Sequence, residues 1–63
     1  MLYVTDHKIN VQQYKKLLKV SDDEIVFLYN KKTVFICGNN LSISYFEKDE
    51  FEVLGTINNI LFE

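Results

Sequence analysis

The sequence lacks proline and tryptophan, and it has only two glycines, one cysteine and one histidine among its 63 residues. A single cysteine excludes an internal disulfide, and with a single histidine it leaves zinc without a set of thiolate and imidazole ligands. Two widely separated glycines exclude a glycine-rich phosphate-binding loop. These absences remove disulfide scaffolds, zinc modules and nucleotide-binding loops from the candidate functions.

A strong charge of one sign and long apolar runs are also missing. The formal net charge of −2 at pH 7 gives no long-range attraction to nucleic acid or to an anionic membrane surface. No apolar run approaches the roughly 20 residues of a membrane-spanning helix. Met1–Val4 is too short for the apolar region of a signal peptide and lacks its basic start. We therefore expect a cytoplasmic protein that does not bind nucleic acid.

Apolar and aromatic residues are abundant for so short a chain. Hydrophobic residues make up 48% of the sequence, and four tyrosines and five phenylalanines are among them. A chain of this size forms one domain, 1–63, with a net stability of only about 3–5 kcal/mol. Aromatic residues that the small core does not need are candidates for a partner surface. The candidates are the tyrosines Tyr3, Tyr14, Tyr29 and Tyr45.

The stretch Thr33–Tyr45 organises the rest of the chain. Residues 34–37 are apolar on both faces, which is typical of a central strand. Residues 41–45 alternate between apolar side chains and serine, which predicts a half-buried strand. Gly38 and Asn40 lie between the two, and both residue types accept a positive φ. We predict two strands joined by a turn, in which Gly38 and Asn40 have structural roles.

Further strands are predicted over 2–5, 24–29 and 51–57. Asn30 and two lysines connect the strand 24–29 to the central stretch, because asparagine accepts the left-handed conformation of a tight turn. Gly55 interrupts the last strand at a bulge or a bend. After it the chain either turns at residues 58–59 or continues as a bent strand to Phe62, and we favour the continuous strand.

The segment before residue 20 is ambiguous. Its apolar residues recur at helical spacing: Val11, Tyr14, Leu17 and Leu18. Asn10 is placed to cap such a helix, so local propensity favours a short helix near residues 11–19 over a strand.

Residues that could perform chemistry are isolated from one another. His7 has no partner except Asp6, and Cys37 ends the most apolar strand, where thiolate formation is suppressed. The cluster Ser21–Glu24 contains three carboxylates, but it lacks the glycine and the distal glutamate of a calcium loop, so we expect a solvated turn. The tyrosines lack the basic residues that accompany stacking aromatics in RNA-binding sheets. We expect a non-enzymatic protein with no metal, no cofactor and no small-molecule substrate.

These segments together predict an all-β fold. We expect a small antiparallel meander of about five or six strands, in a two-layer or barrel-like arrangement in which sequence neighbours pair. The alternative is an α+β domain with one short helix near residues 11–19. No internal repeat is evident.

From Ser21 onward the order of features resembles the YabP/YqfC family of sporulation proteins of endospore-forming bacteria. That family has an acidic turn, an isoleucine, a strand and the motif Ile-x-Gly-x-Asn-Leu-x-Ile, and it ends in Gly-x-Ile-x-x-Ile-x-Phe. The matching residues here are Ile25, Ile36, Gly38, Asn40, Leu41, Ile43, Gly55, Ile57, Ile60 and Phe62. Upstream, 9–18 is similar to a family stretch with asparagine, an aromatic, a basic residue and Gly-Leu-Leu. Lys16 stands where the family often has glycine, and a glycine expected near Thr5 is missing.

The resemblance implies that Val11–Val20 is extended, and we adopt that prediction because β pairing often overrides a weak helix propensity. It further implies a non-catalytic protein of spore envelope assembly, coat or cortex, that acts through protein–protein association. The setting would be the mother cell, at the forespore membrane, with a membrane-embedded sporulation protein or with copies of itself as a homo-oligomer. The alternative is a small homo-oligomeric β module unrelated to sporulation and held by edge-strand pairing.

Overall fold

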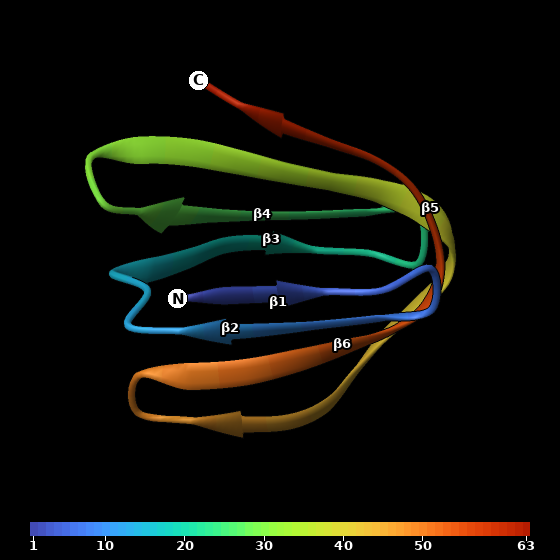
Figure 1. The fold of residues 1–63 in the computed structure, drawn as a ribbon, viewed down its shortest axis with the longest axis horizontal. Helices are drawn as coiled ribbons and strands as arrows, with labels where there is room; N and C mark the ends of the chain where they lie inside the picture. Colours follow the sequence, from blue (N-terminus) through green and yellow to red (C-terminus); the bar gives the residue numbers. More distant parts are fainter.

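All residues from 1 to 63 are described by the computed structural model, in which every strand belongs to one antiparallel sheet (Figure 1). The strands are β1 (Leu2–Val4), β2 (Lys8–Gln12), β3 (Lys16–Val20), β4 (Glu24–Tyr29), β5 (Lys32–Glu47) and β6 (Glu50–Phe62). Their order across the sheet is β1-β2-β6-β5-β4-β3, and the sheet is not closed into a barrel. The predicted all-β antiparallel fold is confirmed. The alternative with a helix near residues 11–19 is wrong, because that segment forms the end of β2, a connection and β3.

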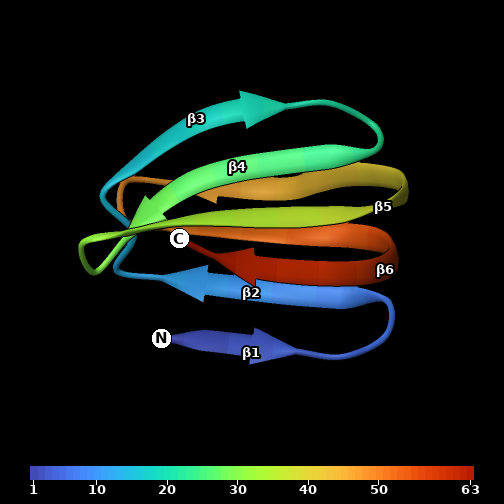
Figure 2. The ribbon, with the colours of Figure 1, turned by 90° about the horizontal axis from the view of Figure 1, so that it is seen from above.

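The two longest strands, β5 and β6, bend and take part in both layers of the fold. The first half of β5 lies between β4 and the second half of β6, whereas its second half pairs with the first half of β6. The first half of β6 also pairs with β2. The first layer therefore contains β1, β2, the first half of β6 and the second half of β5; the second layer contains β3, β4, the first half of β5 and the second half of β6. Figure 2 shows the hairpin β3–β4 on one side of the molecule and β1–β2 on the opposite side.

The core lies between the two layers and is entirely apolar. Eight side chains are fully buried: Ile9, Val11, Ile25, Phe27, Val34, Ile36, Phe51 and Val53. The rings of Phe27 in the second layer and Phe51 in the first meet edge to face, with centroids 5.3 Å apart. Burial of each such side chain stabilises the fold by roughly 1.5–3 kcal/mol, so this contact between layers is a large part of what holds the sheet folded.

The predicted turn at Gly38–Asn40 is wrong, because β5 continues through it as one bent strand. The two halves of β5 lie in different layers and do not pair with each other; each pairs instead with a different half of β6. The ladder with β6 shifts register on both sides of Gly38, and Asn40 has the positive φ of 56° that its residue type favours. The predicted continuous strand through Gly55 to Phe62 is confirmed, and Gly55 has φ 137°.

The bends bring backbones together so closely that two positions exclude side chains. A Cβ on Gly38 would overlap the carbonyl oxygen of Thr56, and a Cβ on Gly55 would lie 2.7 Å from the carbonyl oxygen of Asn40. The two bends therefore lie side by side and approach each other most closely at the glycines.

Two hairpin turns supply hydrogen bonds to the bends. Ser21–Glu24 forms the predicted turn between β3 and β4, and its carbonyls accept the N–H groups of Gly38 and Leu41 at 3.0 and 2.8 Å. The turn between β1 and β2 does the same for β6: the carbonyls of His7 and Asp6 accept the N–H groups of Gly55 and Ile57 at 3.2 and 3.1 Å. Each bend is thus held by the turn of a neighbouring hairpin.

The equivalence of these two hairpins shows an internal repeat that inspection of the sequence does not reveal. Residues 4–11, Val-Thr-Asp-His-Lys-Ile-Asn-Val, align without a gap with 20–27, Val-Ser-Asp-Asp-Glu-Ile-Val-Phe. Likewise 51–55, Phe-Glu-Val-Leu-Gly, align with 34–38, Val-Phe-Ile-Cys-Gly. Strand pairing follows the same correspondence: Ile9 lies opposite Val53, and Ile25 lies opposite Ile36. All eight fully buried side chains occupy equivalent positions in the two halves.

The connections between strands match the prediction only in part. The tight link at Asn30 is confirmed, since Asn30 and Lys31 have φ values of 51° and 69°. Sequence neighbours pair as expected except for β2 and β3, and β2 pairs instead with β6. The link between β2 and β3 includes Gln13, whose φ is 65°, and it crosses from the first layer to the second.

We predict that Gly38→Ala lowers the free energy of unfolding by about 1–3 kcal/mol, because the added methyl group forces the backbones of β5 and β6 apart at their closest approach. Chemical denaturation measures the change. The control is Asn39→Ala at the next, exposed position, where we expect a change within about 0.5 kcal/mol. Equal stability of the two variants would contradict the close approach.

Candidate functional site

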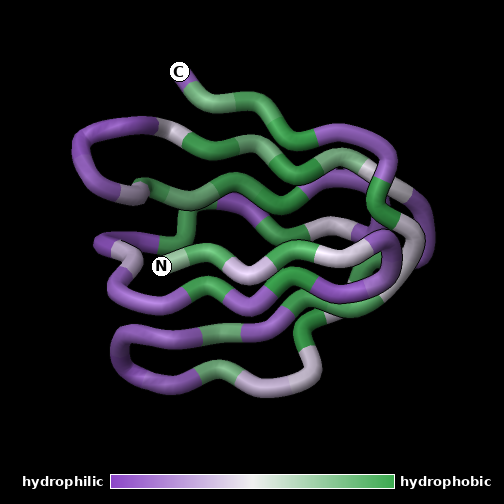
Figure 3. Tube along the Cα trace, viewed as in Figure 1, coloured by the Kyte–Doolittle hydropathy of each residue, from purple (hydrophilic) through white to green (hydrophobic).

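The outer faces of the two layers differ sharply, although the strands beneath them are equivalent. One row of cross-strand neighbours in the first layer is polar: Tyr3, Asn10, Glu52 and Tyr45. The equivalent row in the second layer consists of Lys19, Val26, Phe35 and Leu61. We call Val26, Phe35 and Leu61 the apolar row. In Figure 3 the strands of the second layer that carry it are predominantly hydrophobic, whereas β2 and the first half of β6 alternate.

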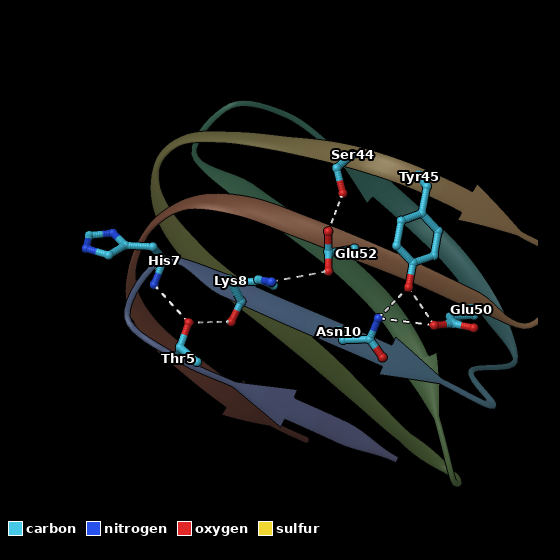
Figure 4. A network of polar contacts seen from close by, with 8 residues as sticks. All are labelled: Thr5, His7, Lys8, Asn10, Ser44, Tyr45, Glu50 and Glu52. Carbon is cyan, nitrogen blue, oxygen red and sulfur yellow. Dashed lines mark hydrogen bonds and ion pairs between the residues drawn. The ribbon is translucent and has the colours of Figure 1, made fainter.

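The polar row is joined by hydrogen bonds between side chains (Figure 4). The hydroxyl of Tyr45 donates to a carboxylate oxygen of Glu50 at 2.5 Å. The amide nitrogen of Asn10 donates to the Tyr45 hydroxyl oxygen at 2.6 Å and to Glu50 at 3.2 Å. Glu52 accepts a hydrogen bond from Ser44 at 2.7 Å, and Lys8 Nζ lies 4.0 Å from its carboxylate. This face is therefore satisfied within the chain.

The hydrogen bond between Tyr45 and Glu50 shifts both pKa values. It lowers the pKa of Glu50 below 4.5, because the hydroxyl stabilises the ionised carboxylate, and Asn10 acts in the same direction. It raises the pKa of Tyr45 above 10.0, because the phenol proton is held by the carboxylate. The pair therefore stays as carboxylate and phenol through the neutral range.

The apolar row lies across the middle of the second layer with polar residues at its borders. Val26 is only 7% exposed, Phe35 is half-buried, and Leu61 is 45% exposed on β6. At the β3 end, Lys19 Nζ lies 2.7 Å from Glu24, and this bond raises the pKa of Lys19 above its ordinary 10.5. The cross-strand neighbours on either side are mainly polar: Glu24 and Asn59 on one side and Lys16 and Thr33 on the other, with Cys37 and Leu28 between them. An apolar centre with a polar border is the usual composition of a protein interface.

The structure does not bring the four predicted tyrosines together. Tyr3 and Tyr45 lie at opposite ends of the polar row, and Tyr3 is 65% exposed. Tyr14 and Tyr29 are half-buried, and both pack against the core. The Tyr14 ring meets Phe51 edge to face at 4.9 Å. Both also line a polar hollow of about 590 Å³ that is bordered by Gln13, Lys15, Asn30 and Asp49.

The isolated chemical residues remain isolated in three dimensions. His7 is exposed in the turn between β1 and β2, and its backbone N–H donates to Thr5 Oγ1 at 3.3 Å. Cys37 is a free, half-buried cysteine opposite Glu24. No group of three or more His, Cys, Asp or Glu side chains is placed to hold a metal ion. The chain contains no helix, and hence none that could span a membrane.

Sequence reasoning missed the apolar row, although its signal is present. Residues 34–37 are apolar on both faces, which correctly predicted a central strand, and residues 24–29 share that pattern. A central strand that is apolar on both faces needs a cover on each. In this structure the core covers one face, whereas the exposure of the other face rises along the row from Val26 at 7% to Leu61 at 45%.

Comparisons with family models, curated protein sequences and solved structures find no match to this chain. The resemblance to the YabP/YqfC family therefore rests on the motif residues. Three of these, Gly38, Asn40 and Gly55, are the residues that form the bends in β5 and β6.

We predict that Tyr45→Phe raises the pKa of Glu50 toward 4.5, because it removes the strongest hydrogen bond to the carboxylate. A carboxyl group whose pKa is lower in the folded state stabilises the fold at pH values above its unfolded-state pKa. This stabilisation is lost as the pH falls through the folded-state pKa. The wild type should therefore lose more stability on acidification than the variant. An NMR titration of the Glu50 side-chain carboxyl, with Tyr3→Phe as control, measures the shift. The same Glu50 pKa in all three proteins would refute the assignment.

Proposed function

We propose that this protein is a non-catalytic association module that binds a protein partner through the apolar row and serves spore envelope assembly, in the coat or the cortex. The observation that carries the association role is the contrast between the two equivalent outer faces. The fold does not require an apolar outer row, because the first layer is built on the same pairing with Asn10 and Glu52 at the equivalent places.

The energetics support association through this row. Removing apolar surface from water stabilises a complex by about 25 cal/mol per Å², and the half-buried Phe35 and the 45% exposed Leu61 offer such surface without breaking a polar contact. Leu61 has no hydrogen-bonding side chain to desolvate, whereas the equivalent Tyr45 is committed to Glu50. A partner that covers the apolar row therefore loses little in desolvation.

The sporulation setting comes from the family resemblance, and with it the expected place of action: the cytoplasm of the mother cell, next to a membrane-embedded partner at the forespore. A second candidate is a homo-oligomeric β module unrelated to sporulation. The observation that favours it is the open edge of β6, since an uncovered strand edge can pair with another chain.

We predict that the tagged protein, followed by fluorescence microscopy in its native host, appears at the onset of sporulation and gathers around the forespore in the mother cell. Immunoblots through growth and sporulation measure its abundance in parallel. Constant abundance in growing cells, with a diffuse distribution, would remove the sporulation role and favour the second candidate.

We predict that Phe35→Ser abolishes this localisation while the protein stays folded, because it replaces the centre of the apolar row with a hydroxyl. The matched control is Glu52→Ser, which places the same side chain at the equivalent position of the polar row. Circular dichroism confirms the folding of both variants. Loss of localisation in both, or in neither, would show that the apolar row does not carry the association.

A further inference from the structure

The folded sheet has four strand edges without a neighbour, and three of them are protected. β1 has only three residues. β3 carries Lys16 and Lys19, and its pairing shifts register between Leu17 and Lys19. The second half of β5 also shifts register, between Ile43 and Tyr45, and ends at Glu47. Short strands, lysines, bulges and terminal charges are the usual devices that prevent edge-to-edge pairing.

The fourth edge, the second half of β6, carries only one of these devices, the terminal charge of Glu63. Asn59–Phe62 contains no charge and pairs in regular register with residues 34–37 of β5. In Figure 1 this part of β6 lies at the rim of the molecule with no strand beyond it. The absence of a lysine and of a register shift within Asn59–Phe62 distinguishes this edge from those of β3 and β5.

The backbone direction at this edge follows from the last ladder bonds. Thr33 and Glu63 exchange both N–H···O bonds, at 2.6 and 2.8 Å. Because hydrogen-bonded and non-hydrogen-bonded pairs alternate along an antiparallel ladder, Leu61 also directs its backbone groups toward β5. Ile60 and Phe62 therefore direct their N–H and C=O groups to the open side.

We propose that this edge pairs with the same edge of a second copy, antiparallel about a two-fold axis at Leu61. Leu61 then faces Leu61 of the second copy, and Ile60 faces Phe62 of the second copy and exchanges backbone hydrogen bonds with it. Asn59 faces Glu63, so no like charges meet. Two-fold pairing of identical surfaces is the commonest form of soluble oligomer.

Side chains on both faces favour this register. On the outer face, the apolar row of one copy continues through Leu61 into the apolar row of the other. On the inner face, Phe62 is 51% exposed, and Ile60 of the second copy would cover it. A register centred one residue earlier, on Ile60, would instead place Leu61 opposite Asn59 and interrupt the row.

The dimer extends the proposed function, because pairing at Leu61 joins the apolar rows of two copies into one surface for a third protein. Only this use of the dimer rests on the proposed function. The paired segment Asn59–Glu63 is short compared with interfaces that bury about 800 Å² per partner. We therefore expect an affinity on the order of micromolar.

Sedimentation equilibrium over roughly 1–500 µM protein tests the dimer across that affinity range. We predict that Leu61→Lys weakens dimerisation at least about tenfold, because it places two ammonium groups opposite each other at the axis. The matched control is Leu54→Lys, on the same strand and 38% exposed on the outer face of the first layer, which should dimerise as the wild type does. A monomeric wild type throughout this range, or equal effects of the two lysines, would overturn the proposal.

Cysteine trapping in a Cys37→Ser background tests the register. In a non-hydrogen-bonded pair the Cα atoms lie about 4.5 Å apart, within disulfide reach, so Leu61→Cys should give a covalent dimer on mild oxidation. Asn59→Cys and Ile60→Cys should not, because the two copies of each residue lie beyond that reach. Trapping through Ile60→Cys in place of Leu61→Cys would overturn the register. A wild type that stays monomeric yet gathers at the forespore would separate the dimer from the proposed function.

Discussion

The fold depends on the bending of β5 and β6 side by side at their two glycines. Without the bends, the six strands would form a flat sheet with one apolar face in water, and a chain of 63 residues has no other element to cover it. This close approach needs two residues without side chains, Gly38 and Gly55. The bends also need acceptors for the N–H groups that the irregular ladder leaves unpaired. The carbonyls of two hairpin turns accept these hydrogen bonds.

The pseudo-symmetry of the two halves separates what the fold demands from what it leaves free. Inner positions keep apolar character in both halves, with isoleucine at both 9 and 25, because each half buries the other. Outer positions have diverged to Asn10 in one half and Val26 in the other. Since the backbone pairing is the same at both places, the pairing alone does not require this difference, and the proposed association would account for it.

The sequence was sufficient to predict where the strands lie, but not which strands pair with one another. Alternation over 41–45 and apolar residues over 34–37 marked both halves of β5, but Gly38 and Asn40 have the same local signature in a turn and in a bend. Val11 and Leu17 have helical spacing only by coincidence, because they lie on strands of different layers, β2 and β3. The site was harder still. Residue type alone points to the tyrosines as contact residues. The residues of the apolar row look like buried strand residues, because periodicity does not report whether the second face of a strand is covered.

The open edge and the apolar row meet at Leu61, which is part of both. An unprotected edge beside apolar surface favours uncontrolled association, and natural sheets remove that risk with charges, bulges or a cover. Three edges of this sheet have such protection. At the fourth, a two-fold pair uses each copy's edge once, so association stops at two chains, whereas pairing with a different edge would continue into a filament. The absence of a protecting charge over Asn59–Phe62 is therefore compatible with a stable, finite assembly only if the edge pairs with itself or with a dedicated partner.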